Sequence, residues 1–114
     1  KNSGRKFDRN TSSRRAMFRT LAANLVLHER IETTEAKAKE VQGQIERMIT
    51  IAKRGDLTAR REIVAGLPNE PLVVNKLMTE IAPKYADRTS GFTRIVRVGM
   101  RKGDAAEIVQ LELV

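Results

Sequence analysis

The chain of 114 residues contains no cysteine, no tryptophan and a single histidine, His28. Without a thiol the sequence supports neither disulfides nor thiolate zinc sites, and it offers no cysteine nucleophile. One imidazole cannot form a metal site built from several histidines. We therefore expect no metal site and no cofactor.

Aromatic side chains are scarce as well, and they are limited to Phe7, Phe18, Tyr85 and Phe92. They do not alternate with basic residues as they do on the base-stacking surfaces of RRM and OB-fold domains, so such a surface is not expected. Phe18 and Phe92 are expected in the core. Phe7 lies in a polar segment and is the one aromatic candidate for contact with a base or a sugar.

Long apolar runs are also missing. None approaches the roughly 20 residues that a membrane-spanning helix needs. The basic start continues into Asp8, Arg9 and Asn10 rather than into the apolar core of a signal peptide. These features predict a soluble protein with no membrane-spanning helix and no signal peptide.

What the chain does have is clustered positive charge, with a formal net charge of +8. The first thirty residues hold eight Lys and Arg against only Asp8 and Glu29. Residues 31–83 balance eight basic against eight acidic residues, and residues 84–103 hold six basic residues against one acidic residue. Two basic segments around a neutral middle predict a single patch if the segments meet in space, with nucleic acid as the expected partner. An anionic membrane surface and a merely solvated basic face remain as alternatives.

Apolar periodicity predicts a first helix behind a basic, polar arm. Thr11, Ser12 and Ser13 are candidates for its N-cap, and its apolar residues recur at helical spacing. Arg15 and Arg19, four residues apart, are expected to point outward together on another face. The buried stripe is expected to consist of Met17, Leu21 and Leu25, with Phe18, Ala22 and Val26 beside them.

Further along, residues 30–34 are rich in β-branched side chains and predict a short strand. Thr34 is a candidate N-cap for a second helix that ends near Gly55, and Asp56 or Thr58 is a candidate N-cap for a shorter third helix. The expected core residues of the second helix are Ala38, Val41, Ile45, Met48, Ile49 and Ala52.

The last third predicts one more helix and a hairpin. Val74, Leu77, Met78 and Ile81 have helical spacing, and Pro83 is expected to halt that helix. Residues 92–98 and 106–113 predict two strands joined by a basic turn. The order helix, strand, three helices, two strands predicts an α+β fold with the helices packed on a small sheet, divided into an arm at 1–13 and a single domain at 14–114.

Evidence for catalysis is weak in this sequence. His28 is interpreted as a helix-end or surface histidine, and the glycines form no phosphate-binding loop. Glu32, Glu35, Glu40 and Glu46 resemble the acidic set of a metal-dependent nuclease, but Lys and Arg are interleaved with them at helical spacing. Solvated charge pairing is the better interpretation, so we expect neither an enzyme nor a small-molecule substrate.

Phosphate binding is better supported. Arg binds phosphates in bidentate fashion, Ser, Thr and Asn add neutral hydrogen bonds, and a helix N-terminus attracts anions. Capping by residues 11–13 alone is the plainer alternative for that segment. Lys37 and Lys39 are open to either RNA contact or pairing with nearby Glu. The candidate RNA-binding residues are Lys1, Arg5, Lys6, Arg9, Asn10, Ser12, Ser13, Arg14, Arg15, Arg19, Lys37, Lys39, Arg94, Arg97, Arg101 and Lys102.

Taken together, four segments in order resemble the bacterial large-subunit ribosomal protein L17 family over nearly the whole chain. Residues 3–19 (SGRKFDRNTSSRRAMFR) are similar to its basic arm and first helix, and IETT at 31–34 followed by AKAKE at 36–40 is similar to its strand-to-helix junction. GFTRI at 91–95 and RKGDA at 101–105 resemble its C-terminal hairpin.

This resemblance implies a structural component of the large ribosomal subunit, located in the cytoplasm in the ribosome and with no membrane partner. Such a protein binds ribosomal RNA, lies beside neighbouring large-subunit proteins on the peptide-exit side, and has no catalytic role. Two other hypotheses use the same residues. A free DNA-associated or regulatory protein would bind duplex DNA, and a nucleic-acid enzyme would need a metal-dependent activity that depends on particular acidic residues.

Overall fold

The computed structural model describes residues 11–67, 70–103 and 105–114, with the side chains of Thr11 and Ser12 excepted. Within these ranges the order of elements is helix, strand, helices, two strands, which confirms the predicted α+β class. The elements are α1 (Thr11–His28), β1 (Arg30–Thr34), α2 (Glu35–Ala52), α3 (Leu57–Gly66), α4 (Pro71–Lys76), the π-helix η1 (Leu77–Ile81), α5 (Ala82–Lys84), β2 (Thr93–Met100) and β3 (Glu107–Leu113).

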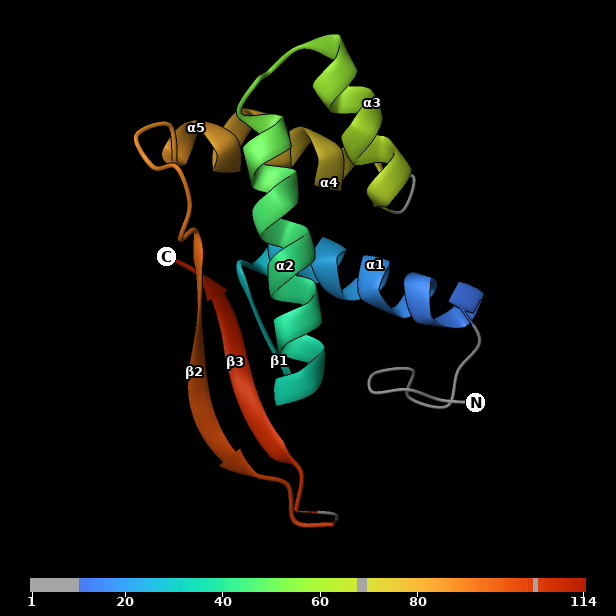
Figure 1. Cartoon of the computed structure of the whole chain (residues 1–114), viewed down its shortest axis with the longest axis vertical. Helices are drawn as coiled ribbons and strands as arrows, with labels where there is room; N and C mark the ends of the chain where they lie inside the picture. The colour runs from blue at the N-terminus through green and yellow to red at the C-terminus, as the bar shows by residue number, and fades with distance from the viewer. Residues whose placement is uncertain (1–10, 68–69, 104) are drawn as a thin grey trace.

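Helix α2 is the centre of the packing and contacts α1, α3, α5, η1 and all three strands (Figure 1). It starts after Thr34, which has extended backbone angles and no side-chain capping bond, and Glu35 in its first turn favours the helix dipole. All six apolar positions expected to be buried on α2 are buried. A helix surrounded in this way needs one apolar face for the sheet and another for its helical neighbours.

The sheet is antiparallel, with strand order β1-β3-β2. Ile31 and Ile95 both lie opposite Leu111, so their side chains share one face with Val109. This face packs against α2, where Val109 and Leu111 are buried. A bulge interrupts the β2–β3 register between Arg97 and Gly99, and Gly99 has a φ of 152°, which favours glycine.

A polar contact joins α2 to the start of β2. The Glu46 carboxylate accepts hydrogen bonds from the Thr93 backbone N–H at 3.0 Å and from the Thr93 hydroxyl at 2.7 Å. Gln42 Nε2 also donates to that hydroxyl at 3.1 Å. The interpretation of Glu46 as a solvated pairing residue was therefore wrong, because its partner is a buried threonine 47 residues away in sequence.

Helix α1 differs from its prediction in two respects. It begins at Thr11, so residues 11–13 form its first turn instead of preceding it, and the residue before them lies outside the described part. Its most buried stripe consists of Phe18, Ala22, Leu25 and Val26, whereas Met17 and Leu21 are only half-buried. The buried face of α1 is rotated from the predicted one because α1 packs against α2, β1 and α4 at once. Residue spacing alone does not reveal this tertiary arrangement.

Pro83 does not halt the last helix, contrary to the prediction. The chain continues from α4 through η1 into α5, and the Ala82 N–H donates to the Leu77 carbonyl five residues earlier. Proline disrupts an α-helix because it lacks an N–H and its ring clashes with the carbonyl four residues before it. The wider π turn immediately before Pro83 changes that spacing, so the helical path accommodates the ring.

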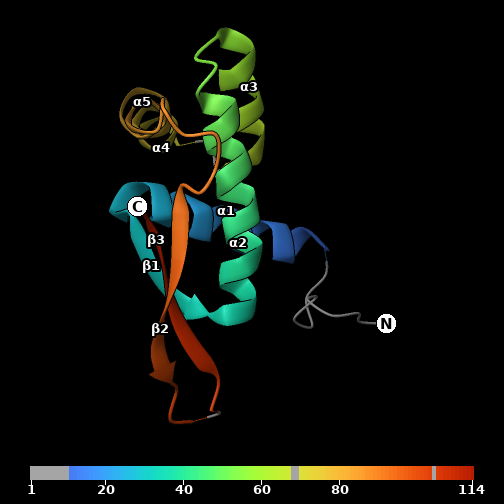
Figure 2. The same ribbon diagram turned by 60° about the vertical axis from the view of Figure 1, so that its left-hand side comes forward.

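The helices lie at one end and along one side of the sheet. Figure 2 shows α4 and α5 above the sheet, with α2 beside it and α1 crossing behind α2. The end of the β2–β3 hairpin projects beyond the helices in both views. The basic turn of the hairpin is therefore presented away from the helical core.

Candidate nucleic-acid interface

Part of the predicted interface lies outside the described residues. Lys1, Arg5, Lys6, Arg9, Asn10 and Phe7 precede the described part, and Ser12 is described only by its backbone in the first turn of α1. The described candidates are Ser13, Arg14, Arg15, Arg19, Lys37, Lys39, Arg94, Arg97, Arg101 and Lys102.

The first half of α1 presents three arginines in different settings. Arg14 forms an ion pair with Glu40 of α2 at 3.8 Å, and its guanidinium lies 6.0 Å from the centroid of the Phe18 ring. Arg15 is exposed and Arg19 half-buried, and within the described ranges neither forms a hydrogen bond or an ion pair. Ser13 is exposed at the edge of a shallow hollow on α1. Arg15 and Arg19 are thus charges that the described fold does not neutralise.

On α2 the two candidate lysines differ. Lys39 is exposed and pairs with Glu35 at 3.3 Å, one helical turn earlier. This favours the pairing interpretation for Lys39, although an exposed ion pair of this kind is worth only about 0.3–0.5 kcal/mol and exchanges readily for a phosphate contact. Lys37 is half-buried at the start of the helix.

The hairpin arginines are paired across the two strands. Arg94 binds the Glu112 carboxylate and Arg97 binds the Glu107 carboxylate. The hydrogen bond from Arg94, followed by one from Gln110, lowers the pKa of Glu112 below its usual value. Arg94 and Arg97 are three residues apart on a strand, so they lie on opposite faces of it. Only some of the RNA-binding residues predicted on the hairpin can therefore contact the same ligand.

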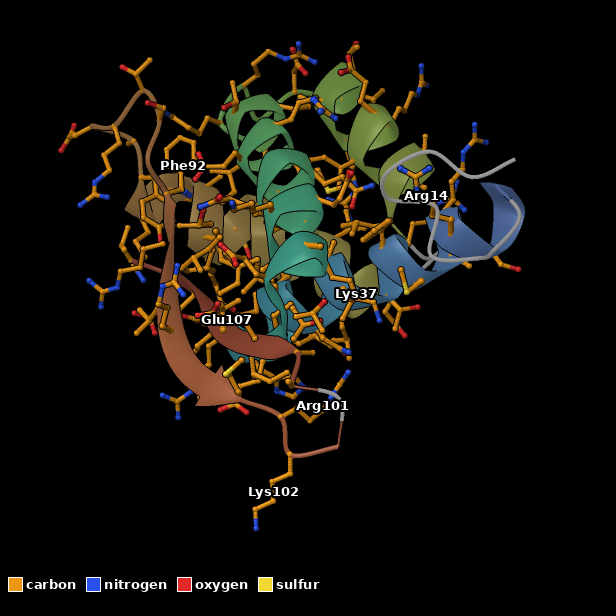
Figure 3. The ribbon with its side chains drawn as sticks, turned by 60° about the horizontal axis from the view of Figure 1, so that its bottom comes forward. Arg14, Lys37, Phe92, Arg101, Lys102 and Glu107 are labelled. Atoms are coloured by element: carbon orange, nitrogen blue, oxygen red, sulfur yellow. The ribbon has the colours of Figure 1, made fainter. Side chains whose placement is uncertain are left out.

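Four of the predicted residues are labelled in Figure 3, which looks at the lower end of Figure 1. In this view Arg14, Lys37, Arg101 and Lys102 follow one another from α1, past the start of α2, to the hairpin turn. They come from α1, α2 and the hairpin turn. Arg101 and Lys102 are exposed, and the Lys102 side chain points away from the body of the protein.

Sequence reasoning missed two residues beside this surface. Gln44 and Arg47 of α2 line hollows next to Arg14 and Arg15 of α1. Arg47 is exposed and has no hydrogen-bond or ion-pair partner among the residues described. The sequence does contain a signal for Arg47. Lys39, Gly43 and Arg47 are spaced four residues apart, which places two cations on one helix face with a glycine between them.

The arrangement suits binding of a polyanion at several points. Arginine forks match phosphate oxygens, and the lysines act as point charges. Within the described residues no group of three acidic or histidine side chains is placed to hold a metal ion. None of the described helices combines the length and apolar character that crossing a membrane requires.

The fold and these residues define a class: a small basic α+β protein with exposed or half-buried cations on α1, on α2 and in the hairpin turn. The family model described as ribosomal protein L17 matches residues 17–114. The chain belongs to this family, which supplies a structural constituent of the large subunit of bacterial ribosomes. It is accordingly a ribonucleoprotein component of translation, located in the cytoplasm in the ribosome.

Relatives in several bacteria support the assignment over more of the chain. The chain is 59% identical over 110 residues to the large ribosomal subunit protein bL17 of Desulfitobacterium hafniense, covering 96% of this chain and 97% of the relative. It is 57% identical over 109 residues to the protein of the same name from Symbiobacterium thermophilum, covering 96% of each chain. For Trichlorobacter lovleyi the identity is 53% over 113 residues, covering 99% of this chain and 90% of the relative.

Proposed function

We propose that the protein holds ribosomal RNA of the large subunit in place through its basic arm, α1 and the C-terminal hairpin, with neighbouring large-subunit proteins as its other partners. The observation that carries this proposal is the position of the unpaired arginines Arg15 and Arg19 on α1, directly after the basic arm. Unpaired arginines on a rigid helix are ordered for phosphate binding, whereas buried or paired ones are not.

Residues 1–13 act as the RNA-binding arm in this proposal, and residues 14–114 as the domain that carries it. Because α1 begins at Thr11, the last three arm residues continue into the helix. The arm and the first arginines of α1 therefore follow one RNA surface. The role of the protein is structural, and the proposal includes neither catalysis nor a cofactor.

A competition experiment tests the role of the arm. Deletion of residues 1–10 leaves every described element whole and removes Lys1, Arg5, Lys6 and Arg9. Equal amounts of the deleted and full-length proteins, distinguished by mass, are offered to large subunits during reconstitution. We expect the deletion to be excluded at least about tenfold, since each lost phosphate contact weakens binding.

A control variant with the four arm cations replaced by glutamine preserves chain length and separates charge from length. Far-ultraviolet circular dichroism shows whether both variants keep the fold. Equal incorporation of the deleted and full-length proteins would contradict the proposed role of the arm. High affinity for duplex DNA without association with ribosomes would instead support a free DNA-binding protein.

A further inference from the structure

A trough lies between α1 and α2, outside the arm and hairpin. Two adjoining hollows of about 310 Å³ each share Glu40 and Gln44 in their walls. Arg14, Arg15 and Phe18 line one hollow from the α1 side, while Lys39, Gly43 and Arg47 line the other along α2. Each hollow has the size of a small-ligand site.

The rim of the trough carries unpaired positive charge on both sides. Arg15 on α1 and Arg47 on α2 are both exposed, and neither pairs with any residue in the described part of the chain. Arginine binds phosphate oxygens through two parallel N–H groups. Two such side chains on facing helices can hold the backbone phosphates on either side of one nucleotide.

Inside the trough the side chains suit a nucleobase better than a phosphate. The Glu40 carboxylate lies here, 3.8 Å from Arg14, and it disfavours a phosphate at the bottom of the trough. A carboxylate instead accepts hydrogen bonds from the amino and imino groups of a nucleobase. The Arg14 guanidinium, held near the Phe18 ring at 6.0 Å, presents a planar cation on which a base can stack.

Gln44 adds an unused acceptor. Its Oε1 atom is shielded from solvent and has no hydrogen-bond partner among the described residues. The residue itself is half-exposed and lines both hollows. A buried acceptor without a donor is unfavourable, and a bound base or ribose hydroxyl would satisfy it.

Gly43 keeps the α2 side of the trough open. A Cβ atom built at this position meets no atom within 4 Å, so the space beside the helix is free. A glycine inside a helix lowers its stability and here fills no packing role.

We propose that this trough binds a single unpaired nucleotide of ribosomal RNA, with its base stacked on Arg14 and hydrogen-bonded to Glu40 and Gln44, and its flanking phosphates on Arg15 and Arg47. This inference rests on the proposed function and adds base recognition to it. It goes beyond the phosphate binding expected from the sequence. It is compatible with the scarcity of aromatic residues, since one inserted base needs no extended aromatic surface.

The absence of cysteine permits a direct test. Gly43→Cys introduces a unique thiol in the trough for an Fe(II)-EDTA tether, and Leu57→Cys, exposed at the start of α3, serves as the control. Both derivatives are incorporated into large subunits, and hydroxyl-radical cleavage of the RNA is mapped. We expect cleavage from position 43 to be confined to a few consecutive nucleotides that position 57 does not cut.

Gln44→Leu provides a second readout. We expect one base whose imino group is protected from a carbodiimide reagent (CMCT) in unaltered subunits to become reactive with this variant, and to stay protected with Arg61→Ala, which removes an exposed arginine of α3. Unchanged reactivity overturns the inference, as does cleavage of a neighbouring polypeptide instead of RNA. If either result is obtained while the protein is still present in the subunits, the proposed function stands and only the nucleotide site is wrong. Failure of the unaltered protein to enter large subunits overturns both the nucleotide site and the proposed function.

Discussion

At the scale of single residues, substitutions of Arg15 and Arg19 should weaken RNA binding without lowering the stability of the fold. Neither forms an ion pair or hydrogen bond in the part of the chain that the structure describes. We therefore expect Arg15→Ala and Arg19→Ala to change the free energy of unfolding by less than about 0.5 kcal/mol. Each should reduce the salt dependence of RNA binding by about one phosphate contact, which filter-binding titrations over a range of salt concentrations measure.

Arg54→Ala is the matched comparison, because it removes a cation that binds Glu62 and is not among the candidate RNA-binding residues. A similar loss of RNA affinity with Arg54→Ala and Arg15→Ala would show that the loss does not depend on the position of Arg15 on α1. A large loss of stability with Arg15→Ala would show that it has a partner in the fold.

Tyr85 gives a pH-dependent prediction. Burial, followed by the negative charge of Glu29, raises the pKa of Tyr85 above its usual value of 10.0, and its hydroxyl donates a hydrogen bond to the Val114 carbonyl at 2.5 Å. The stability that this group contributes is fully present below pH 10 and is lost as the pH rises through the folded-state pKa. Since Tyr85 is the only tyrosine and tryptophan is absent, tyrosinate absorbance reports this group alone.

The absorbance midpoint of the native protein should lie above that of the protein in denaturant. Tyr85→Phe should remove this component of the alkaline loss of stability at a cost of about 1 kcal/mol for the lost hydrogen bond. Identical midpoints in the native and denatured states would contradict the assignment.

At the scale of elements, the glycine inside α2 permits a stabilising substitution. Gly43 has open space where a Cβ would lie, so Gly43→Ala should raise the free energy of unfolding by about 0.5–1 kcal/mol in urea titrations. Gly55→Ala provides a control of opposite sign, because Gly55 has a φ of 71° after the end of α2 and alanine is strained there by about 1 kcal/mol. Destabilisation by Gly43→Ala would indicate that the α2 backbone or the space beside it differs from this description.

The start of α3 depends on a side-chain cap. The Asp56 carboxylate accepts a hydrogen bond from the Ala59 N–H at 2.7 Å. Asp56→Ala should cost about 1 kcal/mol in thermal or urea unfolding, whereas Asp56→Asn should keep most of the stability because asparagine caps comparably. Equal losses with the two variants would point to the charge of Asp56 rather than to capping.

Most of the element order could be predicted from the sequence, and the exceptions have physical causes. The second helix and β1 followed from strong periodicity and β-branched composition, and of the two candidate caps for the third helix, Asp56 and Thr58, the structure has Asp56. The path through Pro83 could not be predicted, because it depends on the π turn before it. Nor could the trough, since Gln44 and Arg47 become neighbours of α1 only through the packing of two helices.

At the scale of the whole molecule, the positive charge behind the net charge of +8 is concentrated in residues 1–30 and 84–103, while residues 31–83 are neutral overall. Binding to RNA should therefore weaken steeply with salt. Deleting residues 1–10 removes four cations and should reduce the magnitude of the slope of log K against log salt by up to about 3, at about 0.7–0.9 per phosphate contact. An unchanged slope would mean that the arm does not touch phosphates.

Sedimentation of a cell lysate through sucrose gradients at low and high salt tests the central claim most directly, with each fraction probed for this protein. A structural constituent of the large subunit is held by many contacts at once, so we predict that it comigrates with that subunit through a high-salt wash. Release to the top of the gradient at modest salt would contradict the account and indicate a loosely associated nucleic-acid-binding protein.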